Sequence, residues 1–183
     1  GDWQFCAQEK LTVDTTLFPN NVRQDDGKIA QISASGPDSK YPMIMYTILR
    51  AIMLAKEEIL ITTPYFVPSE AVIEAIKNAA LSGVKVKLLV PYETNSLVTQ
   101  LASSSYYSAF MAAGVEIYRY KKGFIHAKTS VFDGQFSIIG TANMDNRSFN
   151  LNFEVNGMIY DEELGQQMRD EFAKDLTHSV RLD

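Results

Sequence analysis

Hydrophobic positions follow two regular spacings from Ile29 onward, whereas residues 1–28 follow neither. Short segments in which every second residue is apolar predict strands, and apolar residues three and four positions apart predict helices. Most of these segments end at a glycine or proline, residues that interrupt regular structure. The expected strands are 29–35, 58–63, 84–90, 115–120 and 151–160, with a hairpin before the last, and the expected helices are 43–56, 70–81, 97–113 and 162–176.

Strands that alternate with helices through short connections are typical of an α/β protein with helices on both faces of a sheet. We therefore expect an α/β/α sandwich with a mixed, largely parallel central sheet and an antiparallel portion near the end, formed by residues 29–183. Residues 1–28 are polar and contain an Asp25-Asp26-Gly27 turn signal, so we expect an irregular segment there. Because the chain opens on Gly1 without an initiator Met, we interpret that segment as a link from a preceding half of a longer protein.

Composition and charge exclude several classes of function. The single cysteine among 183 residues allows no intrachain disulfide, and two histidines argue against a multi-histidine metal site. A net charge of -5 is the opposite of what a protein that holds nucleic acid through phosphate contacts needs. No run of about 18 apolar residues is present, so the sequence predicts no membrane span and a soluble chain.

The residues suited to chemistry gather between 124 and 156. Alternation from Ile125 to Thr141 is interrupted at Asp133-Gly134, a strong hairpin signal. A loop of two or four residues centred there predicts that His126 lies opposite Thr141 and Lys128 opposite Ile139. On that register one face of the hairpin and of the following strand carries His126, Lys128, Ser130, Ser137, Thr141, Asn143, Asn152, Glu154 and Asn156.

The residues alone leave two interpretations of this polar face open. Alternation by itself is typical of a solvated outer face. The face is nevertheless poor in long charged side chains, and it combines an imidazole, a fixed cation, neutral hydrogen-bonding groups and a carboxylate. Gly140 precedes Thr141, at a point where a backbone can approach a ligand closely. A site and a solvated face are equally favoured on these grounds.

A motif of fixed spacing favours a functional site over a solvated outer face. The pattern His126-x-Lys128-x4-Asp133-x6-Gly140-Thr141-x-Asn143 resembles the signature of the phospholipase D superfamily, with Thr141 in place of the commoner serine. The surrounding sequences TPYFVP at 63–68, AALSGV at 79–84 and GTANMDNRSFNLNFE at 140–154 resemble the C-terminal half of bacterial cardiolipin synthases.

This resemblance implies phosphatidyl transfer without a metal or other cofactor. In the family, two copies of the motif meet at a pseudo-twofold axis: one histidine forms a phosphohistidine, and the other acts first as acid and then as base. The resemblance gives the acid–base role to His126, charge neutralisation to Lys128 and hydrogen bonding to Thr141 and Asn143. It also implies that Glu154 fixes the tautomer of the histidine in the other half.

Four further residues carry weaker expectations. Asp133 and Gly140 belong to the motif, and a structural role is expected for both, since the register places Asp133 on the apolar side of the turn. Arg147 is a candidate contact to a lipid phosphate or a brace for its loop. Tyr65 is a candidate lining of a lipid access path or a packing residue.

The expected activity is condensation of two phosphatidylglycerols to cardiolipin and glycerol, with this chain as one half-site. The expected partners are the phospholipid substrate and a second half, from the same protein or another subunit. The parent protein is expected at the cell membrane, held by segments absent here, and no nucleic acid partner is expected. The alternatives are a phospholipase D-type phosphodiesterase or nuclease acting as a homodimer, which the pI near 5.1 disfavours, and a non-catalytic dimerisation or lipid-binding module.

Overall fold

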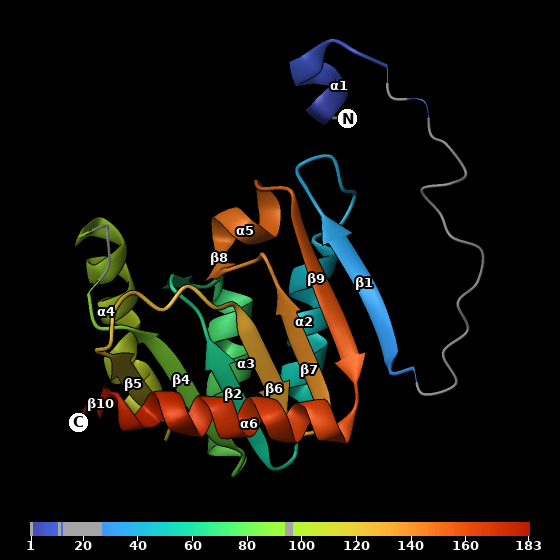
Figure 1. The fold of residues 1–183 in the computed structure, drawn as a ribbon. Helices are drawn as coiled ribbons and strands as arrows, with labels where there is room; N and C mark the ends of the chain where they lie inside the picture. Colours follow the sequence, from blue (N-terminus) through green and yellow to red (C-terminus); the bar gives the residue numbers. More distant parts are fainter. Residues whose placement is uncertain (1, 11, 13–26, 94–96) are drawn as a thin grey trace.

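An eight-stranded mixed sheet organises the chain in the computed structural model, which describes residues 2–10, 12, 27–93 and 97–183 (Figure 1). Along the sheet the strands are β1 (Ile29–Ser35), β9 (Glu154–Tyr160), β7 (Phe136–Gly140), β6 (Thr129–Phe132), β2 (Glu58–Thr62), β4 (Lys85–Pro91), β5 (Glu116–Tyr120) and β10 (Ser179–Arg181). A separate parallel pair joins β3 (Phe66–Val67) to β8 (Met144–Asp145).

The sheet confirms the mixed α/β sandwich but has more antiparallel pairing than expected. Among the described strands, β2–β4 and β4–β5 are the parallel pairs of the large sheet. The other five pairings are antiparallel. The cause is local: the β6–β7 hairpin pairs with β2 on one side and β9 on the other, and both edge strands, β1 and β10, run against their neighbours.

Helices cover both faces of the sheet (Figure 1). On one face, α2 (Met43–Leu54), α3 (Glu70–Leu81) and α4 (Leu97–Ala112) bury residues such as Ile48, Ile76 and Phe110 in the larger hydrophobic cluster. On the other, α6 (Glu162–Thr177) packs Phe172 against Leu60, Leu89 and Val131. The two clusters lie on opposite sides of the strands, which makes the three layers of the sandwich.

Most expected helices and strands are present, and the differences involve short elements. The expected helix 70–81 and strand 29–35 have the observed bounds. The strand expected at 151–160 begins only at Glu154, because 151–153 form the turn that follows α5 (Asn146–Asn150). The segment expected to be irregular contains α1 (Asp2–Ala7), a helix too short for hydrophobic spacing to reveal, while 13–26 lie outside the described residues.

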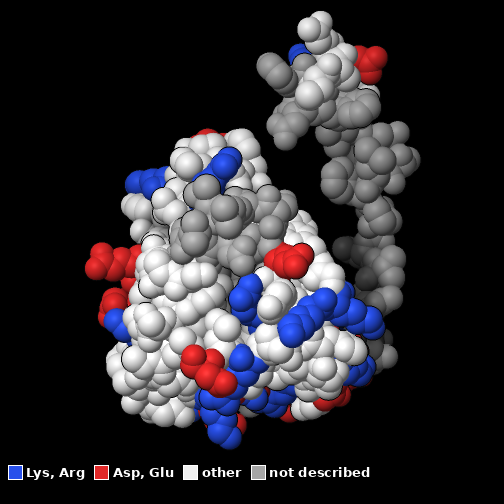
Figure 2. All heavy atoms as spheres, turned by 90° about the vertical axis from the view of Figure 1, so that its left-hand side faces the viewer, with Lys and Arg blue, Asp and Glu red and all other residues white. Residues whose placement is uncertain are grey.

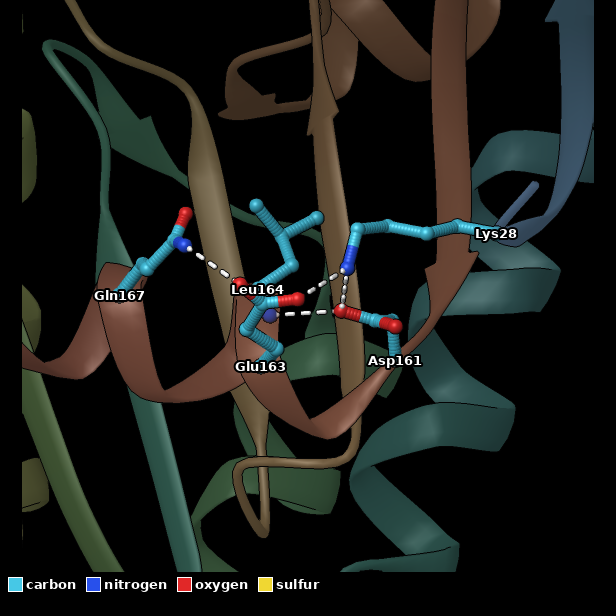
Figure 3. Close-up of polar contacts among 5 residues, drawn as sticks. All are labelled: Lys28, Asp161, Glu163, Leu164 and Gln167. Carbon is cyan, nitrogen blue, oxygen red and sulfur yellow. Dashed lines mark hydrogen bonds and ion pairs between the residues drawn. The ribbon is translucent and has the colours of Figure 1, made fainter. Parts of the chain in front are cut away.

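Lys28 fastens the start of the domain to α6 (Figure 3). Its Nζ lies 2.6 Å from Asp161 Oδ1 and 3.0 Å from Glu163 Oε2. Asp161 also caps α6, since its carboxylate accepts the N–H of Leu164 at 2.7 Å. The residue that precedes edge strand β1 is thereby tied to the helix that follows β9.

In the described ranges, no helix is both long and apolar enough to cross a bilayer.

Candidate active site

The candidate residues other than Asp133 lie toward one end of the sheet, where β2 and β7 end and β6 and β9 begin (Figure 1). Thr62 pairs with Thr129 there, and Gly140 pairs with Asn156. The carboxyl end of β4 lies at the same end, because β4 runs parallel to β2. Ligands of open α/β sheets bind outside the carboxyl ends of parallel strands. The position is therefore one that the fold makes available for a site.

The predicted hairpin register is wrong by one residue. Thr129 pairs with Ile139 and Phe132 with Phe136, so the loop has three residues, 133–135, with Asp133 and Gly134 at φ 53° and 66°. One added loop residue moves every side chain of one strand to the opposite face relative to its partner. Ser130 and Ser137 are consequently buried on opposite sides of the sheet rather than sharing a polar face.

His126 and Lys128 precede β6 instead of lying on it, in an irregular segment after β5. The exposed His126 ring lies 5.7 Å from the ring of Phe124, measured between centroids. The ammonium group of Lys128 donates a hydrogen bond to the carbonyl oxygen of His126 at 2.8 Å. Partial burial lowers the pKa of Lys128, and the negative charges of Glu154 and Asp145 offset part of that change.

Thr141 and Glu154 form the second part of the cluster. The hydroxyl of Thr141 donates to Glu154 Oε2 and accepts the N–H of Val155 at 2.9 Å. The other carboxylate oxygen of Glu154 accepts from Asn152 Nδ2 at 3.1 Å. Within the described part of the chain, neither Glu154 nor any other side chain forms a hydrogen bond with the His126 imidazole. Glu154 is thus held in place without orienting the histidine of its own half.

Asn143 follows Thr141 by two residues, and its side chain is hydrogen-bonded to Ser148. Both its backbone N–H and its Nδ2 donate to Ser148 Oγ, at 3.1 and 3.2 Å. Its Oδ1 is buried and has no hydrogen-bond partner among the described residues. A buried acceptor without a partner is unusual, and in native proteins it calls for a specific explanation. The structure therefore gives Asn143 a positioned amide with one unused oxygen, rather than the free donor expected from sequence.

Gly140 is packed against protein. A Cβ at this position would lie 2.0 Å from Asn156 Oδ1 and 2.5 Å from the carbonyl oxygen of Val155. Asn156 is buried, and its Oδ1 accepts the N–H of Ala142 at 3.3 Å. The absence of a side chain at Gly140 thus makes room for Asn156, which in turn holds the backbone that leads to Asn143.

Asp133 lies at the opposite end of β6 from Lys128, in the hairpin turn. Its carboxylate accepts the backbone N–H groups of Lys56, Glu57 and Glu58, each at 2.9 Å. Partial burial acts to raise the pKa of Asp133, but these three donors and the nearby charge of Arg169 together hold it below its ordinary value. The motif aspartate therefore links the turn to the segment that enters β2.

The two candidate substrate contacts differ in their surroundings. The half-buried Tyr65 packs its ring against Phe124 at a centroid distance of 6.2 Å, which places it beside the His126 segment. Arg147 is exposed on α5, and among the described residues no acidic side chain pairs with it. Its carbonyl oxygen accepts the N–H groups of Leu151 and Asn152, so its backbone closes the turn after α5.

Sequence reasoning missed the residues that support the site. Phe124 stacks near His126, Asp145 contributes negative charge beside Lys128, and Ser148 holds Asn143. The spacing Asp145-x-x-Ser148 was a usable signal, because Asp145 caps α5 by accepting the Ser148 N–H at 2.7 Å. Across the described residues, no group of three or more His, Cys, Asp or Glu side chains is arranged to hold a metal ion.

Comparison with known proteins identifies relatives along the whole chain. Residues 48–176 match the family described as cardiolipin synthase, PLD-like domain. The chain is 40% identical over 182 residues to a protein named cardiolipin synthase from Geobacillus thermodenitrificans, covering 100% of this chain and 36% of that protein. A cardiolipin synthase from Oceanobacillus iheyensis is 45% identical over 181 residues, covering 99% of this chain and 37% of the relative.

Solved structures share the fold at low sequence identity. A phospholipase D family member, Nuc, from Salmonella typhimurium superposes with a TM-score of 0.72 at 18% identity, covering 85% of this chain and 99% of that chain. A phosphatidylserine synthase from Haemophilus influenzae gives 0.68 at 17% identity, covering 86% and 41%. The chain spans little more than a third of the curated relatives it matches. The resemblance inferred from the motif is confirmed, and the chain belongs to the cardiolipin synthase family of phospholipase D-like domains.

Proposed function

We propose that this chain supplies one half of the active site of a phosphatidyltransferase, which condenses two phosphatidylglycerols to cardiolipin and glycerol. The observation that carries the proposal is the Lys128, Thr141 and Glu154 cluster beside His126. It lies at the ligand-binding end of the sheet, in a chain 40–45% identical along its length to proteins named cardiolipin synthase.

In the proposed reaction His126 is the acid and base, and a histidine of the second half is the nucleophile. The nucleophilic nitrogen bonds to phosphorus, the bond from phosphorus to the glycerol oxygen breaks, and His126 gives its proton to that oxygen. His126 then takes the proton from the hydroxyl of a second phosphatidylglycerol, whose oxygen displaces the histidine and forms cardiolipin. An imidazole suits both steps, because its ordinary pKa near 6.5 makes both forms available near neutral pH.

The remaining residues would stabilise charge and position this exchange. Lys128 would neutralise the non-bridging phosphate oxygens, which gain charge in the transition state. Thr141, which bonds Glu154, would orient that carboxylate toward the histidine of the second half. The unused Oδ1 of Asn143 would accept a hydrogen bond from a group that arrives with the substrate or the second half. Arg147 and Tyr65 would contact the lipid at the margin of the site.

Asp133 and Gly140 would have structural roles and would not contact the substrate. Asp133 holds the closed end of the hairpin through three backbone N–H groups, and Gly140 makes room for Asn156 at the open end. The Asp133 carboxylate lies at the far end of β6 from the Lys128 cluster, and Gly140 has no side chain that could enter it. We further propose that the complete protein works at the membrane, since both of its substrates are bilayer lipids.

Complementation between two halves tests the proposal. The mass of this chain in solution is measured first, to show that it is monomeric. Cardiolipin formation from phosphatidylglycerol in detergent is then assayed for the chain alone and for the chain mixed with an N-terminal fragment of a cardiolipin synthase relative, one third to two thirds of that relative in length. Three results together would support the proposal: the chain by itself forms no cardiolipin, addition of the other half produces activity, and His126→Ala abolishes that activity. Activity of the monomer alone, or hydrolysis of DNA with none of phosphatidylglycerol, would refute it.

A further inference from the structure

A band of basic and aromatic side chains borders the candidate site along the end of β5. We define this basic rim as Tyr92, Arg119, Lys121, Lys122 and Phe124. Figure 2 faces the side of the molecule on which β5 lies, where Lys and Arg side chains are interspersed with Asp and Glu side chains. The rim is distinct from the Lys128 cluster, and none of its five residues has a role in the transfer reaction described above.

Direct contacts join three of the rim residues, Tyr92, Arg119 and Lys121. The guanidinium carbon of Arg119 lies 4.3 Å from the centre of the Tyr92 ring, and the Lys121 Nζ lies 5.1 Å from the same point. Arg119 also donates a hydrogen bond to the carbonyl oxygen of Tyr92. Two cations thus share one exposed aromatic ring, an arrangement that holds both side chains at the surface.

The rim reaches the candidate site directly. Only Gly123 separates Lys122 from Phe124, whose ring is 43% exposed and lies 5.7 Å from the His126 ring. Arg119 lines a small hollow together with Pro64, the residue before Tyr65. A molecule resting on the rim would therefore lie beside both His126 and Tyr65.

The cations of the rim lie close together, since Arg119 and Lys121 share the Tyr92 ring and Lys122 follows Lys121. Within the described residues, Arg119, Lys121 and Lys122 form no ion pair with a carboxylate. Even with Glu93, which follows Tyr92, the rim keeps an excess of positive charge in a chain of net charge -5. Unpaired cations on an otherwise acidic protein favour a negatively charged partner.

We propose that the basic rim docks this domain on an anionic lipid bilayer. Basic residues near a bilayer are attracted to anionic headgroups, and exposed aromatic rings lie favourably at the boundary between headgroups and hydrocarbon. The rim combines the two beside His126. The inference rests on the proposed function in one respect: phosphatidylglycerol, the proposed substrate, is itself an anionic lipid, so docking would bring the site to its substrate.

Vesicle sedimentation tests the docking surface without requiring turnover. The chain is mixed with vesicles of phosphatidylcholine alone or of three parts phosphatidylcholine to one part phosphatidylglycerol, at low and at high salt. We expect binding to the anionic vesicles that weakens as salt rises. Because each basic residue near an anionic surface strengthens partitioning about fivefold, Arg119→Gln/Lys121→Gln/Lys122→Gln should weaken it about a hundredfold.

Two further variants separate docking from folding and from bulk charge. Lys121→Gln/Lys122→Gln leaves the Arg119 bond to Tyr92 intact and should still weaken binding about 25-fold, from the same fivefold estimate. Arg50→Gln/Lys56→Gln/Lys85→Gln removes the same charge on α2, before β2 and at the first residue of β4, away from the rim, and should change binding less than about fivefold.

The outcomes decide the proposal. Equal loss in the rim and control variants, equal binding to neutral vesicles, or no binding to anionic vesicles would overturn it. Displacement from the vesicles by a 20-nucleotide single strand at a far lower phosphate concentration would also overturn it, since the rim would then be a nucleic acid surface. Vesicle binding is measured without catalysis, so a failure of the proposed transferase activity would leave this result unaffected.

Discussion

Replacing Asp133 with Asn tests whether the motif aspartate supports the fold. Its carboxylate receives the Glu57 and Glu58 N–H groups on Oδ1 and the Lys56 N–H on Oδ2. Asparagine has a similar shape and tolerates the left-handed backbone at this position, where φ is 53°. The substitution therefore removes the charge and one acceptor with little change in backbone preference.

The expected loss of stability follows from those bonds. Hydrogen bonds to a charged partner contribute about 1.5–3 kcal/mol each, and those between neutral groups about 1 kcal/mol. The lower end of the first range applies, because Asp133 is partly exposed. Asparagine keeps two neutral bonds through its single oxygen and loses the third, so the free energy of unfolding should fall by about 2.5 kcal/mol at pH 7.

Urea unfolding of the isolated chain between pH 7 and pH 3 measures this effect. The pKa of Asp133 is lower in the folded chain than its ordinary value of 3.8, so its contribution is complete above that value. It disappears as the pH falls through the lower folded value, because the carboxyl becomes protonated in both states. The difference between parent and Asp133→Asn should therefore shrink below about pH 4. The exposed Asp170→Asn is the control and should change stability by less than about 0.5 kcal/mol. A difference that stays constant with pH, or one no larger than the control's, would refute the reasoning.

Three other predictions concern packing and charge. Gly165→Ala should cost about 2–3 kcal/mol in urea unfolding, because its Cβ would lie 2.0 Å from the carbonyl oxygen of Gly134, a backbone atom of the hairpin turn; an unchanged midpoint would contradict the packing of α6. Glu154→Gln should lower the pKa of Lys128 further, since it removes a charge that opposes the effect of burial, and an NMR titration of labelled lysine that shows no decrease would count against the cluster. In a complete cardiolipin synthase, Lys128→Met should reduce kcat far more than it raises KM, because the charge it stabilises appears in the transition state; a raised KM at constant kcat would instead make Lys128 a binding residue.

The elements that the sequence predicted well are those with strong local signals. The helix 70–81 combines helical spacing of apolar residues with Gly83 after its end, and Gly83 adopts φ 95° in the structure. Such signals depend on neighbouring residues, so tertiary contacts are not needed to interpret them. The short pair β3–β8 carries no such signal, because each strand has two residues and is held by a partner far away in the sequence.

The structure brings several of the candidate residues together, but the register expected for them is wrong. Asp133-Gly134 indicates a hairpin but fits loops of two, three or four residues, and the choice among them depends on contacts with residues far away in the sequence, such as those of Asp133 with Lys56 and Glu58. The burial of Ser130 and Ser137 follows from that one-residue difference. The motif selected Lys128 and Thr141, and the family resemblance added Glu154; the fold brings all three to one end of the sheet.

The spacing of the motif now has a physical explanation in the hairpin. His126 and Lys128 lie at the open end of β6, the four residues of β6 follow, and Asp133 holds the closed end. The chain then returns along β7 to Gly140 and Thr141. Gly140 lies opposite Lys128, since its N–H donates a hydrogen bond to the Lys128 carbonyl oxygen at 3.2 Å. One residue added to the turn would move a different residue of β7 opposite Lys128 and break this bond. Asp133 therefore secures the turn whose length fixes which residues meet at the open end of the hairpin.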